Sequence, residues 1–209
     1  MNKIKAIIFD LDGVLIDAKE WHYDALNRAL KIFGYEISRH EHLSTYDGLP
    51  TKRKLEILSS EQGLPLKLHD LINNLKQNLT FEMIVTNCKP VFHHQYAISK
   101  LKGKGYGLAV ASNSVRASVE AMLERSSLLS YFDFYLSNQD VQKSKPSPEI
   151  YLKAIQRFNL QSSECLIVED NPVGLAAAVA TGAHVLQVNS VDEVNFQNIS
   201  LFINSCENK

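Results

Sequence analysis

Near its beginning the chain reads Ile4-Lys5-Ala6-Ile7-Ile8-Phe9-Asp10-Leu11-Asp12-Gly13-Val14, an apolar run that ends in two carboxylates one residue apart. The run is short and rich in Ile and Phe, as is typical of a strand buried on both faces. Asp is rare inside strands, so Asp10 and Asp12 are expected just past the strand's end. Ligands of an open parallel sheet bind beyond the carboxyl ends of its strands, so this end predicts a place where a substrate and a cation meet.

An acid pair of this kind needs support from the rest of the chain. Two carboxylates about 4 Å apart repel each other by about 4 kcal/mol at an effective dielectric of about 20, and a divalent cation would offset that repulsion. The pattern Asp-x-Asp alone also fits an ordinary polar loop. The interpretation therefore depends on the other strand ends.

Composition excludes some classes of function. With 22 basic and 23 acidic residues among 209, the net charge is -1, so no general field attracts nucleic acid or an anionic membrane, and we expect neither as a partner. Cys88, Cys165 and Cys206 are widely spaced, and we expect free thiols in a reducing cytosol. Because no signal-peptide pattern and no apolar run of membrane-spanning length is found, a cytoplasmic location is expected.

Strand-like and helix-like segments alternate along most of the chain. The strand-like runs are 6–9, 107–111, 132–136, 166–168 and 185–188. This alternation predicts an α/β fold, with a doubly wound, mainly parallel, Rossmann-like sheet. Between Val14 and Asn87 only helical patterns follow one another. We therefore expect a helical domain, residues 15–87, inserted into an α/β core made of residues 1–14 and 88–209.

Three helices are expected in the inserted segment. The first begins near Asp17 and stops at Gly34, a typical residue for a helix end. The second begins near Thr51 and runs towards Gly63, and the third covers 68 to about 79.

The second core strand ends in Ser112-Asn113-Ser114, directly before a helical pattern. A helix N-terminus offers free backbone N–H groups and a partial positive charge, which suits a phosphate. The same serines could simply cap the helix. Both interpretations stay open at this point.

A lysine precedes the next helix, in Lys145-Pro146-Ser147-Pro148. Ser147 suits the cap and Pro148 the first helical position. Lys145 would then be held where its charge neutralises a phosphoryl oxygen, whereas an isolated lysine would be an exposed surface charge.

The fourth segment is Leu166-Ile167-Val168-Glu169-Asp170-Asn171-Pro172-Val173-Gly174, a buried strand that ends in adjacent acids. Asn171 and Pro172 are typical of a helix start. Asp170 is the candidate for a direct cation ligand, and Glu169 for a water-mediated ligand or a supporting group.

An acid pair, a hydroxyl, a lysine and a second acid pair thus follow four strand ends or adjoining loops in this order. The set resembles the haloacid dehalogenase superfamily, specifically its capped phosphatases and β-phosphoglucomutases, over nearly the whole chain. The resemblance implies a monomeric, Mg²⁺-dependent phosphatase that hydrolyses a small phosphorylated metabolite such as a sugar phosphate. The alternative that it implies is phosphoryl transfer within a sugar phosphate, as in β-phosphoglucomutase.

The resemblance also implies roles for individual residues. Asp10 would be the nucleophile that forms an aspartyl phosphate, and Asp12 the general acid and base. The Asp12 carbonyl and the side chains of Asp10 and Asp170 would hold Mg²⁺, with Glu169 nearby. Ser112, Asn113 and Lys145 would bind the phosphoryl group. Related dehalogenases lack the second acid, so their chemistry is disfavoured.

The inserted domain would be a cap that supplies specificity by closing over the site. His22 lies where β-phosphoglucomutases carry a histidine that interacts with the acid/base Asp, although an ordinary surface histidine fits equally well. In those mutases a cap arginine grips a second phosphate. Thr51 takes its place here, and Lys52 or Arg53 would have to replace it in binding the substrate.

The same residues bear on two further functions. Cleavage of a phosphonate requires a cap lysine that forms a Schiff base, for which Lys52 and Lys54 are available. A non-catalytic sensor of phosphorylated metabolites would not need the intact set of Asp10, Asp12, Lys145 and Asp170. Both rank below the phosphatase.

Overall fold

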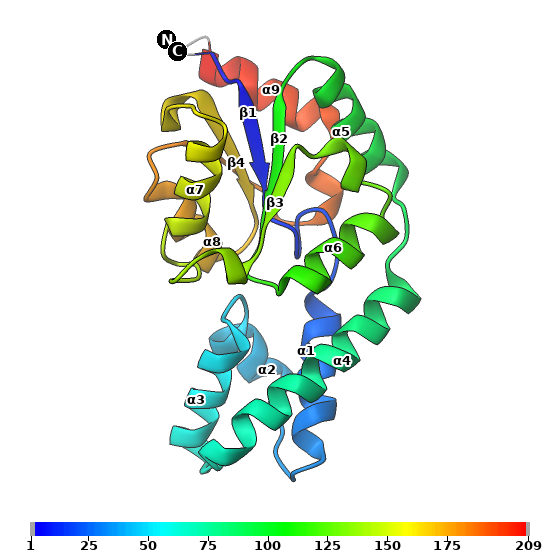
Figure 1. Cartoon of the computed structure of the whole chain (residues 1–209), viewed down its shortest axis with the longest axis vertical. Coiled ribbons are helices and arrows are strands. Elements are labelled where there is room, and N and C mark those ends of the chain that lie inside the picture. The colour runs from blue at the N-terminus through cyan, green and yellow to red at the C-terminus, as the bar shows by residue number, and fades with distance from the viewer. Residues whose placement is uncertain (1–2, 208–209) are drawn as a thin grey trace. The chain divides into compact units, whose positions relative to one another are not determined.

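The strands form one parallel sheet in the computed structural model, which describes residues 3–207. Its order is β3-β2-β1-β4-β5, and every neighbouring pair is parallel. The strands are β1 (Ala6–Phe9), β2 (Gly107–Ala111), β3 (Phe134–Leu136), β4 (Cys165–Glu169) and β5 (His184–Gln187). The helices of this part are α5 (Phe92–Gly103), α6 (Arg116–Arg125), α7 (Glu149–Arg157), α8 (Pro172–Val179) and α9 (Phe196–Glu207). They lie on both faces of the sheet (Figure 1), which confirms the predicted doubly wound α/β fold.

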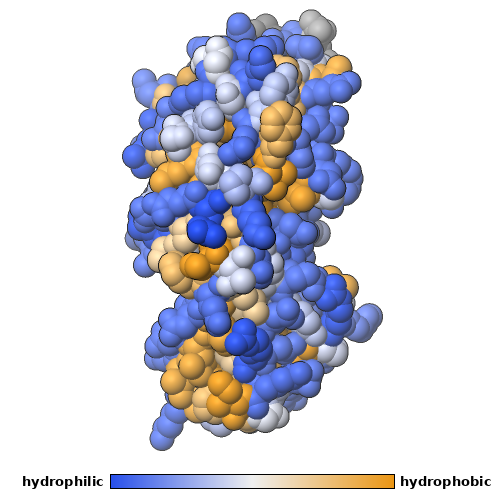
Figure 2. Space-filling model, turned by 90° about the vertical axis from the view of Figure 1, so that its right-hand side faces the viewer, coloured by the Kyte–Doolittle hydropathy of each residue, from blue (hydrophilic) through white to orange (hydrophobic). Residues whose placement is uncertain are grey.

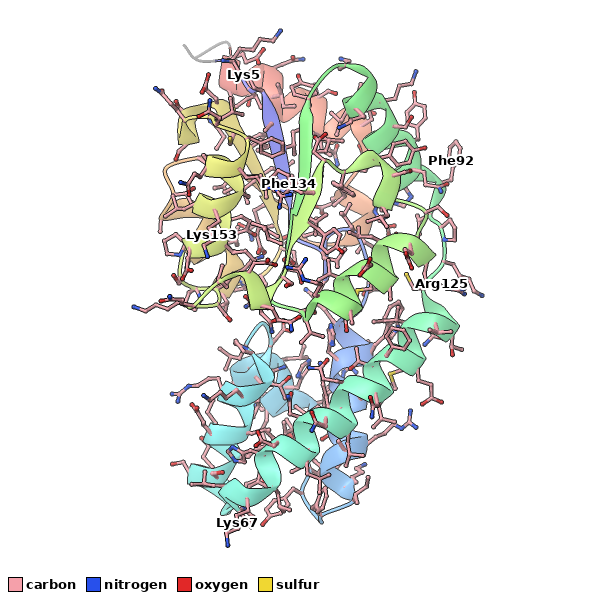
Figure 3. All side chains as sticks on the ribbon, in the orientation of Figure 1. Lys5, Lys67, Phe92, Arg125, Phe134 and Lys153 are labelled. Atoms are coloured by element: carbon pink, nitrogen blue, oxygen red, sulfur yellow. The ribbon has the colours of Figure 1, made fainter. Side chains whose placement is uncertain are left out.

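The central strands are buried on both faces, as their composition predicted. All residues of β1 and β4 are buried, and alternate side chains point to opposite faces. On one face Ile8 and Ile167 pack with Ile150 of α7 and Ala177 of α8. Phe134 of the edge strand β3, labelled in Figure 3, is partly buried and packs against this cluster. The core therefore fixes the strand ends from both sides.

Short 3₁₀ turns complete the loops and shift some predicted boundaries by a residue or two. They are Leu66–Leu68, Leu129–Tyr131, Asn138–Asp140, Ser162–Glu164 and Val191–Glu193. β3 begins at Phe134, two residues later than predicted, and Phe132 and Asp133 connect it to the turn that ends at Tyr131. The helix after Lys145 takes Pro148 as its N-cap and begins at Glu149 rather than at Pro148.

The chain divides into two compact units, one formed by the residues up to Asp17 and from Cys88 on, and one by Ala18–Asn87. The second unit, here called the helical unit, has a buried cluster of its own. It comprises α1 (Lys19–Lys31), α2 (Arg39–Glu41), a π-helical turn (His42–Tyr46), α3 (Thr51–Gln62) and α4 (His69–Asn87). Gly63 ends α3 with φ of 71°, which is the left-handed conformation that glycine adopts easily.

The third predicted helix of this unit is longer than expected. α4 continues to Asn87 rather than ending near Leu79. Its last two turns contain β-branched residues with low helix propensity, but Thr80 and Ile84 are fully buried there. Thr80 also donates a hydrogen bond to the Lys76 carbonyl at 2.8 Å. Packing therefore outweighs local propensity.

The surface mixes charged and apolar residues. Figure 2 shows hydrophobic side chains dispersed among hydrophilic ones on the face that it draws. Within residues 3–207, no helix combines the length and apolar character that crossing a bilayer requires. The three cysteines are free thiols, as predicted.

Candidate active site

The ends of neighbouring strands place the predicted acids and the predicted hydroxyl at one edge of the sheet. Phe9 pairs with Val110 on one side and with Val168 on the other. The backbone N–H of Asp10 still bonds the Val168 carbonyl at 3.0 Å, and that of Ser112 bonds the Leu136 carbonyl at 3.0 Å. Both residues are therefore fixed by the sheet although they lie beyond their strands.

A tight turn follows Asp12. Gly13 has φ of 90°, a conformation that side-chain-bearing residues rarely adopt, and its N–H donates to the Ile16 carbonyl at 2.7 Å. The turn returns the chain immediately after the second acid, which keeps Asp12 at the sheet's edge.

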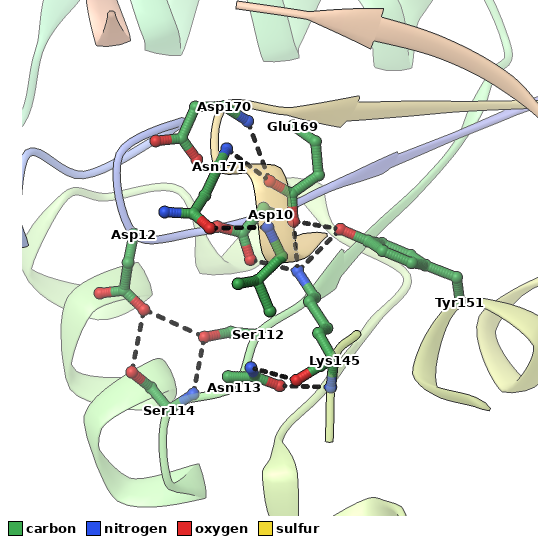
Figure 4. Close-up of polar contacts among 11 residues, drawn as sticks. Asp10, Asp12, Ser112, Asn113, Ser114, Lys145, Tyr151, Glu169, Asp170 and Asn171 are labelled. Atoms are coloured by element: carbon green, nitrogen blue, oxygen red, sulfur yellow. Dashed lines mark hydrogen bonds and ion pairs between the residues drawn. The ribbon is translucent and has the colours of Figure 1, made fainter. Parts of the chain in front are cut away.

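Lys145 lies between two buried carboxylates (Figure 4). Its ammonium donates to Asp10 Oδ1 at 2.6 Å and to Glu169 Oε1 at 2.7 Å. Lys145 is 4% exposed, Asp10 7% and Glu169 1%, so water screens these charges little. Asn113 holds the lysine's backbone, because its Oδ1 accepts the Lys145 N–H at 3.1 Å. Lys145 is thus the centre of a buried ionic cluster, and the alternative of an exposed surface lysine is wrong.

Glu169 uses both of its oxygens. Oε1 accepts hydrogen bonds from Lys145 and, at 2.8 Å, from the Tyr151 hydroxyl. Oε2 accepts the backbone N–H groups of Asp170 at 2.9 Å and Asn171 at 3.2 Å. Asn171 caps α8 as predicted, its Oδ1 accepting the Val173 N–H at 2.9 Å. With these bonds made, Glu169 fits a supporting role better than direct binding of a cation.

Asp12 is held by two serines of the loop after β2. Ser112 and Ser114 each donate a hydroxyl to Asp12 Oδ2, at 3.1 and 2.9 Å. The Ser114 N–H in turn donates to Ser112 Oγ at 3.0 Å. Neither serine caps α6, whose N-cap is Val115 without a side-chain bond. The alternative of a simple capping role is therefore wrong for Ser112.

Burial and charge shift the pKa values in opposite directions across the cluster. Burial raises the pKa of Asp10 well above its ordinary value, although Lys145 acts against the shift. Burial also acts to raise the pKa of Glu169, but there Lys145 and Tyr151 outweigh it, and the pKa falls. For Lys145 burial acts to lower the pKa, and the two carboxylates outweigh it, so the lysine stays charged. The ammonium therefore outweighs the effect of burial on the pKa of Glu169 but not on that of Asp10.

A third acid makes the site suitable for a cation. Carboxylate oxygens of Asp10, Glu169 and Asp170 lie within 4.8 Å of one another. Three carboxylates around one ammonium carry a net charge of about minus two when all are ionised, and hard divalent cations prefer oxygen ligands. The donor set therefore fits Mg²⁺.

The remaining predicted residues lie in the helical unit. His22 Nδ1 lies 3.2 Å from the Lys76 ammonium, and Lys52 is exposed in the first turn of α3. Lys54, in the same turn, is buried at 7% exposure, and burial lowers its pKa to about 8 despite Asp47.

Two residues of the core site were not singled out in the sequence, Ser114 and Tyr151. Ser114 belongs to the segment Ser112-Asn113-Ser114, and its position as a polar residue just after a strand end was the signal that could have identified it. Tyr151 falls among the apolar positions of a helix, where an aromatic residue is expected simply to fill the core.

This fold and site define a class of enzyme with a carboxylate pair, a lysine and a second acid pair on a doubly wound sheet. A family model of haloacid dehalogenase-like hydrolases matches residues 7–188. The chain therefore belongs to the haloacid dehalogenase-like hydrolases, and the resemblance stated from the motifs is confirmed.

Relatives of this chain are named as phosphatases. The phosphorylated carbohydrates phosphatase of Thermotoga maritima is 29% identical over 187 residues, covering 86% of this chain and 82% of the relative. The fructose-1-phosphate phosphatase YqaB of Escherichia coli is 27% identical over 192 residues, covering 90% of this chain and 97% of the relative. At the level of reaction class, the prediction of a phosphoric monoester hydrolase is confirmed.

Solved structures share the fold. CbbY from Rhodobacter sphaeroides, determined in complex with phosphate, has a TM-score of 0.79 and 26% identity, covering 88% of this chain and 85% of that one. A β-phosphoglucomutase from Clostridium difficile has a TM-score of 0.84 and covers 99% of this chain and 100% of that one. At 20% identity, the second likeness shows the fold alone.

Proposed function

We propose that this chain is a Mg²⁺-dependent phosphatase that hydrolyses small phosphorylated metabolites, sugar phosphates among them, through an aspartyl phosphate on Asp10. One observation carries the proposal: Lys145 bridges Asp10 and Glu169 at 2.6 and 2.7 Å, directly beside an Asp12 held by two serines. This arrangement supplies a nucleophile, compensating charge and a second acid at one edge of the sheet.

The first half of the reaction follows from the positions of Asp10 and Asp12. Lys145 donates a hydrogen bond to Oδ1 of Asp10, and the other oxygen of that carboxylate, Oδ2, attacks phosphorus. The new phosphorus–oxygen bond forms as the bond to the ester oxygen breaks, and Asp12 gives its proton to that leaving oxygen. The positive charge of the nearby Lys145 stabilises the phosphoryl charge as it shifts.

The second half regenerates the free enzyme. Asp12, now deprotonated, accepts a proton from a water molecule, whose oxygen attacks the same phosphorus. The bond between phosphorus and Asp10 breaks, which releases inorganic phosphate. The two serine hydroxyls on Asp12 Oδ2 favour one orientation of this carboxylate in both steps.

Mg²⁺ would be held by the side chains of Asp10 and Asp170 and by the Asp12 carbonyl. Glu169, whose oxygens accept four hydrogen bonds, would support the site from behind. When bound, the ion would neutralise phosphoryl oxygens so that an anionic carboxylate can approach them.

The helical unit would serve as the cap, with His22 and Lys52 on it as candidates for substrate contact. The T. maritima and E. coli relatives are named for phosphorylated carbohydrates and fructose 1-phosphate. These names support a phosphorylated sugar as the substrate. We also expect a monomer, as the resemblance implies.

The test is release of phosphate from p-nitrophenyl phosphate in the presence of Mg²⁺, followed by a panel of sugar phosphates. Asp10→Asn should abolish turnover, and Asp24→Asn, an exposed carboxylate of α1, is the matched control that should not. Full activity of Asp10→Asn would eliminate the mechanism. With β-glucose 1-phosphate, formation of glucose 6-phosphate would instead establish the mutase alternative, whereas free glucose and phosphate support the phosphatase.

A further inference from the structure

Tyr151 lies beneath the catalytic lysine. It is the third residue of α7 and is fully buried, with its ring in the core cluster between α7 and the sheet. The Lys145 ammonium lies 4.5 Å from the centre of that ring. The hydroxyl of Tyr151 makes the hydrogen bonds to the ionic cluster (Figure 4).

Each N–H donor of the Lys145 ammonium has an identified acceptor. An ammonium has three N–H donors and no acceptor. Lys145 directs them to Asp10 Oδ1 at 2.6 Å, Glu169 Oε1 at 2.7 Å and the Tyr151 oxygen at 2.7 Å. Tyr151 has a single proton, which it donates to Glu169 Oε1 at 2.8 Å. Its oxygen is therefore an acceptor for Lys145, and all three lysine donors are committed in one geometry.

The tyrosine does more than satisfy a buried carboxylate. A lysine carries its charge on a flexible four-carbon stem with three rotatable donors. Two carboxylates alone leave the ammonium free to rotate and to shift from Asp10 towards Glu169. The third acceptor removes this freedom, because it closes a triangle of Lys145, Glu169 and Tyr151 that leaves one N–H aimed at Asp10.

We propose that Tyr151 is a positioning residue that aims the Lys145 ammonium at the nucleophile Asp10. Its hydroxyl bonds Lys145 and Glu169, and it acts on Asp10 through the lysine. The expected effect on the reaction rate rests on the proposed function, whereas the expected effect on the hydrogen bonds of the Lys145 ammonium does not. Misplacing a catalytic group slightly costs a large factor in rate, so removal of the hydroxyl should slow the reaction without changing substrate affinity.

The experiment compares Tyr151→Phe with the wild-type protein by two readouts. The first is steady-state hydrolysis of p-nitrophenyl phosphate, with the folded fraction checked by circular dichroism. We expect kcat to fall about tenfold and KM to stay within about twofold. The second is side-chain ¹⁵N NMR of the lysine ammonium groups in the metal-free protein, with the Lys145 signal assigned from its loss in Lys145→Met. Tyr96→Phe, an exposed tyrosine of α5, is the control that should alter neither.

The NMR readout does not depend on turnover. Buried, hydrogen-bonded protons exchange slowly with water, so the wild-type Lys145 ammonium should give a slowly exchanging signal that Tyr151→Phe accelerates at least tenfold. An unchanged signal together with unchanged kcat would overturn the proposal. If the wild-type protein hydrolyses no phosphate ester, the proposed function fails, and the NMR comparison alone tests whether Tyr151 positions Lys145. Should Tyr151→Phe not fold, a wild-type Lys145 signal that exchanges as fast as surface lysines would overturn it.

Discussion

Gly174 of α8 packs so closely against the Glu169 carboxylate of β4 that no further atom fits between them. A Cβ on Gly174 would lie 1.7 Å from Glu169 Oε1 and 2.5 Å from Oε2. The first turn of α8 can therefore approach the carboxylate only because residue 174 lacks a side chain. The absence of a side chain at Gly174 therefore lets Glu169 take the position in which it binds Lys145.

Gly174→Ala should accordingly disrupt the site. The added methyl group displaces Glu169, and we expect the free energy of unfolding to fall by about 1–3 kcal/mol, as for an overpacked core, and kcat to fall by about 100-fold. Urea unfolding and phosphatase assays measure the two effects. In Gly103→Ala, where a Cβ meets nothing within 4 Å, stability should be unchanged or higher by up to about 1 kcal/mol. Equal behaviour of the two variants would contradict the packing argument.

Removal of the lysine charge should be costly in stability as well as in activity. Lys145→Met leaves the buried carboxylates of Asp10 and Glu169 without their cation, and breaking such a buried pair costs about 3–5 kcal/mol. Adding Glu169→Gln should recover part of this loss, because one of the uncompensated charges disappears. A double-mutant cycle by urea unfolding measures the coupling. Additive effects of the two changes would show that the ion pair at 2.7 Å is not coupled.

Mg²⁺ should raise the thermal stability of the wild-type protein. A ligand that binds only the folded state at about 100 times its Kd adds about 2.7 kcal/mol. Asp170→Asn should lose most of this gain, while Asp192→Asn, whose side chain is 84% exposed, should keep it. Differential scanning fluorimetry with and without Mg²⁺ makes the comparison. A full Mg²⁺ response in Asp170→Asn would exclude Asp170 as a ligand.

The buried Lys54 of the helical unit predicts a pH dependence of stability. Burial lowers its pKa from 10.5 to about 8 in the folded state. Below pH 8 both states carry the charge and the folded state bears the full cost of burying it. Between about pH 8 and 10.5 the unfolded state binds more protons, so this residue's contribution makes stability rise with pH.

Lys54→Met should therefore stabilise the protein at pH 7 by about 1–3 kcal/mol, since one pKa unit corresponds to about 1.4 kcal/mol. The advantage over the wild type should shrink as the pH rises from 8 to 10.5. Lys52→Met, an exposed neighbour on the same turn, should change stability by less than about 0.5 kcal/mol. Urea unfolding at pH 7 and at pH 10 decides the matter, and a destabilised Lys54→Met at pH 7 would count against the buried charge.

The strand ends were predictable because their signals are local. β1 and β2 begin and end where their apolar runs do, and parallel pairing brings successive strand ends to one edge. Asp10, Ser112 and Glu169 could therefore be placed together before any coordinates were known. Lys145 was expected near them from the turn Lys145-Pro146-Ser147-Pro148, although the same lysine taken alone would also fit an exposed surface charge.

Other features depend on tertiary packing that no short segment encodes. Tyr151 meets Lys145 six residues away and Glu169 eighteen away, and only the packing of α7 on the sheet brings these groups together. The π-helical turn His42–Tyr46 and the last turns of α4 likewise escape prediction, because buried contacts there outweigh the preferences of the individual residues.

The helical unit is one unbroken stretch of chain, Ala18–Asn87, with its own buried cluster. All of the groups proposed to break the phosphate ester are encoded before or after it. Under the proposed function, recombination at the two ends of this unit would replace the residues that select the substrate and leave the residues that attack phosphorus unchanged. Evolution could diversify such enzymes by trading a single gene fragment.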